Sequence, residues 1–319
     1  MKKRIILFLV IAMLSCCLGG CSNQRATVTT TIYPVKYIVE QLAGDRVDVE
    51  YISTDDFIQR AEMVPNYKSI LERTTLFIHI GELEPYMDIY ENDIMSYDFQ
   101  IINLANLSAV NKFKRYTTGS VNGVTVTTES EYYNTDLFDM VDTYDKDPFI
   151  WLDPIAMASM ASTIKDWLQS YYPEDALIFE NNFKNLQASL VRMDAEYQSL
   201  KSLNVKLVTV GCTFGNWQKP YYVQLYPLVM SKYGVLPTEE QLNVIKQAIK
   251  DNDVKYIVKD ETLPEDMLQL YEQVKEELSL TEISLSSISK LSATDIEKNK
   301  DYITIMYDNL ITLEDAFKK

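Results

Sequence analysis

One long apolar stripe constrains the fold of this chain more than any other feature. Between residues 174 and 202, apolar side chains recur in steps of four and three, which is the spacing of one face of an α-helix. The stripe consists of Phe179, Phe183, Leu186, Leu190, Met193, Tyr197 and Leu200. A helix of this span is about 43 Å long at 1.5 Å per residue. A coiled coil has the same spacing, but a single such helix between two globular segments fits a strut better.

Short strand and helix patterns alternate on both sides of this helix. Before it, the patterns predict strands at residues 26–31, 47–52, 76–80 and 101–104, and helices at 34–43, 65–73 and 154–169. After it, they predict strands at 205–210 and 254–258, and helices at 238–251, 264–278 and 301–317. Such alternation with short connections implies parallel sheets covered by helices. We therefore expect α/β lobes at residues 21–172 and 204–319, joined by a linking helix at 173–203.

The first twenty residues have the pattern of a secretory signal. Lys2, Lys3 and Arg4 precede a short apolar run, which ends in Leu-Gly-Gly before Cys21. The run is too short to remain as a membrane span. The ending looks like the acylation site of bacterial lipoproteins, so residues 1–20 are expected to be removed. Cys21 would then carry the lipid and anchor the protein at the outer face of the cell membrane.

The net charge and the cysteine content indicate which partners and which disulfide bonds to expect. The formal net charge is −16, and removal of the three basic signal residues takes it to −19. Such a surface repels nucleic acid and anionic lipid headgroups, so we expect no nucleic-acid partner and no membrane contact beyond the anchor. The mature chain keeps only Cys21 and Cys212, and the first would be acylated. We therefore expect a monomer stabilised by packing, with no intramolecular disulfide.

Residues 112–147 interrupt the strand and helix alternation. They contain Gly119, Gly123 and a threonine-rich run. Acidic residues follow: Glu129, Glu131, Asp136, Asp139, Asp142, Asp145 and Asp147. Several recur at intervals of three, without the one-three-five spacing and central glycine of a calcium loop. The segment is predicted to be a solvated insertion, with a cation site as the alternative.

The sequence gives no support for an enzyme. His79 is the only histidine, and it lies at the end of a predicted strand, where it is expected to be structural. A Ser/His/Asp or Cys/His set cannot be built around it, and neither a Walker loop nor a G-x-G-x-x-G motif is present. Tyr221 and Tyr222 are candidates to line a cleft for an organic ligand.

Several motifs, taken in order, resemble the zinc/manganese solute-binding proteins of bacterial ABC importers. They are Thr31-Ile32-Tyr33-Pro34, Gly44-Asp45, Glu84-Pro85-Tyr86-Met87-Asp88, Trp151-Leu152-Asp153-Pro154, Phe214-Gly215, Asp301-Tyr302 and Asn309-Leu310. The resemblance covers nearly all of the mature chain. It implies a two-lobed protein that captures Zn²⁺ or Mn²⁺ between its lobes and delivers it to a membrane permease with its ATPase.

The resemblance also implies where the metal ligands should lie. The two histidines of the first lobe match Gln59 and Phe149, and the third ligand matches Gly211. The fourth, an aspartate, matches Lys300, or Asp301 if the alignment slips by one residue. Zn²⁺ requires about four N, S or carboxylate donors, and this set does not supply them. The sequence thus retains the motifs of the family but lacks its standard metal ligands.

Three alternatives remain open. A rebuilt metal site would draw on Glu62, Cys212, Asp260 and Glu261, although Cys212 alone fits a small buried residue. Lys300 would replace the cation if it lay in the interlobe cleft and paired with Glu62 or another acid; otherwise it is a solvated loop residue. The same fold would also suit an accessory or interaction lipoprotein, or a binder of a small organic solute.

The backbone at the third ligand position is a separate question. Gly211 could have a positive φ, which a larger side chain would resist.

Overall fold

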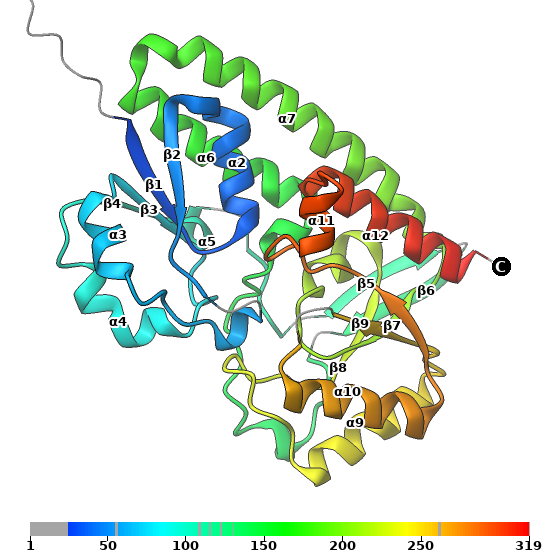
Figure 1. Cartoon of the computed structure of the whole chain (residues 1–319). Coiled ribbons are helices and arrows are strands. Elements are labelled where there is room, and N and C mark those ends of the chain that lie inside the picture. The colour runs from blue at the N-terminus through cyan, green and yellow to red at the C-terminus, as the bar shows by residue number, and fades with distance from the viewer. Residues whose placement is uncertain are drawn as a thin grey trace, which may run out of the picture.

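The computed structural model describes residues 25–54, 57–107, 110–114, 116–121, 123–129, 131–260 and 263–318. The signal segment, Cys21 and Glu261 lie outside the described residues. The described chain forms two lobes, each built on a four-stranded parallel sheet flanked by helices, and one long helix joins them (Figure 1). This arrangement confirms the fold class that the sequence predicts.

The first lobe contains a sheet with strand order β2-β1-β3-β4. Its strands are β1 (Ala26–Thr30), β2 (Val47–Tyr51), β3 (Leu76–His79) and β4 (Gln100–Asn103). Its helices are α2 (Tyr33–Ala43), α3 (Tyr67–Arg73), α4 (Tyr86–Ile94), α5 (Leu104–Leu107) and α6 (Pro154–Tyr171). All four strands are confirmed within one residue at each end, whereas α4 and α5 were not among the predicted helices. Asp153 caps α6 by accepting from the backbone N–H groups of Ile155 and Ala156.

The second lobe contains a sheet with strand order β10-β9-β7-β8. Its strands are β7 (Lys206–Thr209), β8 (Gln224–Pro227), β9 (Tyr256–Lys259) and β10 (Thr281–Ser284). Its helices are α8 (Gln218–Tyr221), α9 (Glu239–Asp251), α10 (Glu265–Leu278), α11 (Ala293–Glu297) and α12 (Tyr302–Phe317). Thr238 and Gln241 form the predicted capping box at the start of α9. The sequence patterns do not predict β8, β10, α8 or α11.

The long helix α7 spans Ala176–Tyr197, with 3₁₀ turns at Pro173–Asp175 and Gln198–Ser202. Every residue of the apolar stripe is buried. One end of α7 packs against α2 and α6 of the first lobe, and the helix also contacts α12 of the second (Figure 1). The stripe therefore belongs to a strut that supports both lobes, as predicted, rather than to a coiled coil.

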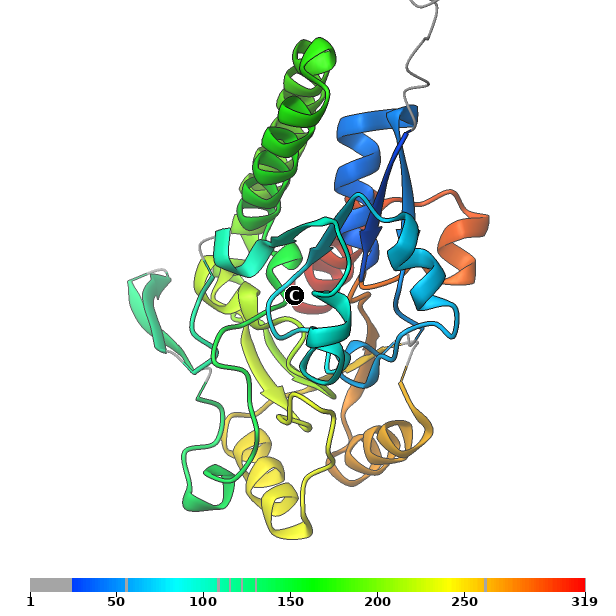
Figure 2. The same ribbon diagram turned by 90° about the vertical axis from the view of Figure 1, so that its left-hand side faces the viewer.

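The segment between α5 and α6 contacts the second lobe. It contains an antiparallel hairpin, β5 (Tyr116–Val121) and β6 (Val124–Glu129), which Figure 2 shows at the side of the molecule. The Tyr133 hydroxyl donates to the Pro227 carbonyl at 2.9 Å, and the Lys232 N–H donates to the Asp142 carbonyl at 2.8 Å. Most of the acidic residues of this segment are exposed, which agrees with the predicted solvated insertion. Asp147 and several aromatic residues are buried, so the segment also packs against the rest of the molecule. The exact lobe boundaries remain a prediction.

Candidate functional site

The two parallel sheets direct the loops at their carboxyl ends toward the region between the lobes, where ligands of such sheets bind. The loop after β10 crosses this region. The Ser289 carbonyl accepts from the Tyr33 N–H at 2.9 Å, and the Ser287 carbonyl accepts from the indole N–H of Trp151 at 2.8 Å. The candidate site therefore lies between the lobes.

The structure brings together two of the predicted ligand positions, Gln59 and Gly211. Gln59 lies in a 3₁₀ turn of the first lobe with only 1% of its surface exposed, and its Nε2 lies 3.5 Å from the Ser231 carbonyl. A Cβ atom on Gly211 would lie 3.0 Å from Gln59 Oε1 and 3.5 Å from Phe57 Cζ. The carboxamide thus fills the space that a side chain at position 211 would need.

The possibility of a positive φ at Gly211 is not realised in the structure. Among the described glycines, positive φ values occur at Gly44, Gly81, Gly123 and Gly234. The backbone at position 211 would accept another residue, so the neighbouring Gln59 side chain is what favours glycine there.

Phe149 lies in an aromatic core. Its ring is fully buried, with ring centroids 6.0 Å from Tyr144 and 5.5 Å from Trp151. The Tyr144 hydroxyl lies 3.4 Å from the carbonyl oxygens of Leu83 and Lys232, which belong to different lobes. The benzyl ring therefore supports the contact between the lobes and offers no metal ligand.

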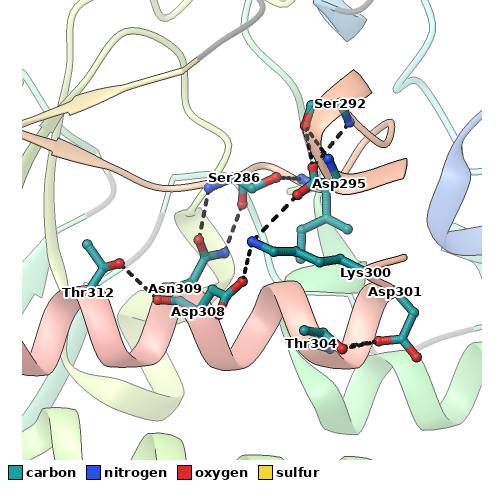
Figure 3. Close-up of polar contacts among 10 residues, drawn as sticks. Ser286, Ser292, Asp295, Lys300, Asp301, Thr304, Asp308, Asn309 and Thr312 are labelled. Atoms are coloured by element: carbon teal, nitrogen blue, oxygen red, sulfur yellow. Dashed lines mark hydrogen bonds and ion pairs between the residues drawn. The ribbon is translucent and has the colours of Figure 1, made fainter. Parts of the chain in front are cut away.

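Lys300 does not reach across the cleft. Its Nζ lies 2.7 Å from Asp308 Oδ2 and 3.8 Å from Asp295 Oδ1, both in the second lobe (Figure 3). Lys300 does pair with acids, but the predicted position in the interlobe cleft beside Glu62 or another acid is wrong, because α11 and α12 place two second-lobe carboxylates near the ammonium. The alternative of a solvated loop residue is wrong as well. Asp301 caps α12 by accepting from the Thr304 N–H at 2.8 Å.

The loop after β10 is the part of the site that sequence reasoning missed. Asn309 fixes this loop, because its side chain accepts from the Ser286 N–H and donates to the Ser286 carbonyl, both at 2.9 Å (Figure 3). The Asn309-Leu310 motif placed the fourth position at Lys300, whereas the segment that contacts the first lobe is the serine-rich run 284–289. The serine-rich composition of this run is the sequence signal that could have identified it.

The rebuilt metal site does not assemble within the described part of the chain. Cys212 is buried, its thiol lies 3.6 Å from the Val229 carbonyl, and burial raises its pKa well above the usual range. Asp260 lines a pocket of about 420 Å³ that also contains Lys300, whereas Glu62 lies at an exposed position on the first lobe. No group of three or more His, Cys, Asp or Glu side chains that could hold a metal occurs among the residues described. Cys212 has the environment of a small core residue.

Two buried titratable groups lie in the first lobe. Burial raises the pKa of Glu84 to about 8, while the nearby Thr31 hydroxyl acts in the opposite direction. Burial lowers the pKa of His79 to about 4, and its ring packs against Phe77. Both side chains are therefore mainly neutral at pH 7. This environment fits the structural role predicted for His79.

Arg60 ties the lobes together. Its guanidinium donates to both carboxylate oxygens of Asp266 at 2.8 and 2.9 Å, and to the Gly234 carbonyl at 2.6 and 3.2 Å. Arg60 also holds the pKa of Asp266 below its usual range. We call these contacts the interlobe tie. They join the two lobes beside Gln59, and a bidentate geometry of this kind is specific to arginine.

A pocket of about 540 Å³ opens beside Gln59 and Arg60. Tyrosines from both lobes line it: Tyr67, Tyr86, Tyr90 and Tyr233. The tyrosines predicted for a cleft lie elsewhere. Tyr221 is buried against Tyr197, and the ring of Tyr222 covers Gly119 of the hairpin.

Comparison with known proteins gives the same fold and one family. The model of the family described as zinc-uptake complex component A, periplasmic, matches residues 28–316. The chain is 24% identical to the zinc-binding lipoprotein AdcA of Streptococcus pneumoniae, with 98% of this chain and 61% of AdcA covered. It is 22% identical to the high-affinity zinc uptake system protein ZnuA of Bacillus subtilis, with 92% and 88% covered. The chain thus spans about three fifths of the AdcA relative.

Solved structures agree on the architecture. The periplasmic zinc-binding protein TroA of Treponema pallidum gives a TM-score of 0.71 at 15% identity, with 92% of this chain and 99% of that chain covered. AdcAII of Streptococcus pneumoniae gives 0.70 at 17% identity, with 91% and 98% covered. Within the described residues, no helix has the length and apolar character needed to cross a membrane. Because the family model matches nearly the whole chain, this protein belongs to the family of zinc-uptake complex component A.

Proposed function

We propose that this protein is the extracytoplasmic solute-binding component of an ABC importer of the zinc-uptake type. It is a monomeric binding protein rather than an enzyme, it is anchored through Cys21, and it delivers its solute to a permease with its ATPase. Family membership, the two-lobed fold and the lipoprotein name of the AdcA relative support this proposal.

The proposed cargo is not held by the standard zinc or manganese ligands. The observation that carries this point is the packing of the Gln59 carboxamide against Gly211, where two family ligands would meet. The pocket beside them has about 540 Å³ and tyrosine walls, a size suited to a small organic molecule. We therefore propose that a solute binds in this pocket, at the edge of the contact between the lobes.

A second candidate is an accessory or interaction lipoprotein on the same fold. The interlobe tie favours it, because Arg60 and Asp266 join the lobes through groups of the protein itself. In a solute-binding protein of this kind, the cargo itself would normally stabilise the closed form.

Metal binding tests the proposed site directly. We expect the mature protein, purified without chelators, to contain less than stoichiometric zinc or manganese. In calorimetry, neither ion should bind more tightly than about 1 µM, which corresponds to about −8 kcal/mol. A stoichiometric nanomolar site would contradict the filled site. Co-isolation with a permease from membranes tests the importer assignment separately.

A further inference from the structure

The acidic run singled out in the sequence borders an apolar pocket on the second lobe. The pocket has a volume of about 280 Å³. Its walls come from residues 138–142 and from segments 228–231 and 233–241. Phe138, Val141, Leu236 and Pro237 supply much of the apolar surface. This pocket is distinct from the candidate solute site, although Tyr233 lines both.

Hydrogen bonds and ring packing fix the walls of the pocket. Phe138 is buried, and its ring centroid lies 5.2 Å from that of Tyr133. The Gln241 side chain donates to the Leu137 carbonyl at 2.7 Å, which connects the start of α9 to this segment. Because both walls are held by such contacts, the pocket is formed before any partner arrives.

Two apolar side chains that line the pocket also face water. Met140 is 93% exposed and Val235 64%, and Leu137, next to the lining residue Phe138 in the chain, is 41% exposed. Single exposed apolar residues are common on proteins, but exposed apolar residues gathered at an apolar pocket form a patch suited to a partner. A long apolar side chain would fit the space between them.

Acidic groups outnumber basic ones around the pocket. Asp142 lines it, and Asp136, Asp139, Glu239 and Glu240 are close in sequence to lining residues. Two basic residues lie nearby: Lys232 stands between the lining residues Ser231 and Tyr233, and Arg60 donates to the Gly234 carbonyl. Both have acidic partners outside this group, since Lys232 Nζ lies 3.8 Å from Asp88 and Arg60 pairs with Asp266. The rim therefore favours a basic partner.

We propose that this pocket and its acidic rim bind a protein segment that presents one long apolar side chain flanked by lysine or arginine. The apolar side chain enters the pocket between Met140 and Val235, and the basic groups pair with the rim. Burial of the anchor supplies affinity, while the charges select the partner and speed the encounter. Anionic lipid and nucleic acid are excluded by the same acidic rim.

Peptide binding tests this surface. The probe is a fluorescein-labelled Lys-Lys-Leu-Lys-Lys peptide with blocked ends, titrated with the mature protein at low salt and followed by fluorescence anisotropy. We expect saturable binding that weakens as salt rises. A Lys-Lys-Ser-Lys-Lys peptide should bind at least tenfold more weakly, and a Glu-Glu-Leu-Glu-Glu peptide should not bind.

Surface variants locate the binding. Met140→Ser with Val235→Ser, and separately Asp136→Asn with Asp139→Asn, should each weaken binding at least fivefold. Matched controls use exposed residues elsewhere: Leu177→Ser with Val191→Ser on α7, and Glu72→Gln with Asp98→Asn on the first lobe. Equal binding of the leucine and serine peptides, or equal losses in the control variants, would overturn the proposal and leave only diffuse charge attraction.

Discussion

At the scale of single residues, Gln59 and Gly211 form one unit. Gly211→Ala would place a methyl group 3.0 Å from Gln59 Oε1 in a buried site, and such overpacking costs about 1–3 kcal/mol. We expect this cost to fall by about 1 kcal/mol in a Gln59→Ala background, since the obstructing carboxamide is then absent. Urea denaturation of the four proteins of this cycle measures the coupling. Additive effects would show that the two positions do not touch.

Glu84 makes stability depend on pH in an unusual direction. Its pKa is raised to about 8 in the folded protein, from about 4.3 in an unfolded chain. Between these values the folded state retains a proton that the unfolded state loses, so the free energy of unfolding falls as pH rises. The slope approaches about 1.4 kcal/mol per pH unit and levels off above pH 8.

Glu84→Gln should remove this dependence because the amide cannot titrate. Chemical denaturation at pH 6, 7 and 8 should show that the variant gains stability relative to the parent protein as pH rises. The comparison cancels His79, whose lowered pKa destabilises the fold only on the acidic side of its unfolded value. Parallel curves for the two proteins would mean that Glu84 is solvated or permanently charged.

At the scale of elements, the sequence patterns predicted the features that depend on residues close together in the chain. The stripe of α7 and the capping box at Thr238 depend on residues a few positions apart, and both are confirmed. The unpredicted strands β8 and β10 lie at the two edges of their sheet and have four residues each. β8 ends in Pro227, and β10 buries only Ile283, so neither shows a clear strand pattern. Their pairing depends on neighbours distant in sequence.

The hairpin β5–β6 depends on one glycine for its close approach to the second lobe. A Cβ atom on Gly119 would overlap the ring of Tyr222. Gly119→Ala should therefore displace the hairpin and lower stability by about 1–3 kcal/mol. Tyr222→Ala should reduce that penalty, whereas Ser120→Ala provides a control at the neighbouring exposed position of the same strand. Thermal unfolding and proteolysis between residues 110 and 131 report the two effects. A control penalty equal to that of Gly119→Ala would contradict the contact.

At the scale of the whole molecule, the site was only partly predictable. The family resemblance selected Gln59 and Gly211, which do meet between the lobes. It misplaced Lys300, because the position of a loop between α11 and α12 depends on packing that sequence order does not reveal. The pairing of Arg60 with Asp266 spans 206 positions, and no local pattern connects them. The contacts between the lobes are therefore the part of this protein that could not be predicted from the sequence.

We expect the interlobe tie to stabilise the closed form even when no cargo is bound. Arg60→Ala removes the bidentate contact with Asp266 and the hydrogen bonds to the Gly234 carbonyl, so that Asp266 loses the guanidinium and keeps the hydrogen bond from the Met267 N–H. We expect a loss of about 1–2 kcal/mol from the closed form, which changes the ratio of closed to open molecules by a factor of about 5–30. Arg60→Lys should restore little, because an ammonium cannot reproduce the bidentate geometry.

Distances between spin labels on Ile89→Cys and Glu239→Cys measure this change, since the two positions are exposed on different lobes and Cys212 is buried. The parent protein should show one short distance without added solute, and Arg60→Ala should add a longer one. Arg46→Ala is the matched control, because its pair with Asp175 at 2.6 Å joins the first lobe to the start of α7 and does not cross the cleft.

Acidification should open the parent protein as well. The pKa of Asp266 is lowered in the folded protein, so the interlobe tie persists at neutral pH and is lost as the carboxylate takes up a proton. A single unchanged distance in Arg60→Ala would show that the aromatic contacts around Phe149 hold the lobes closed by themselves.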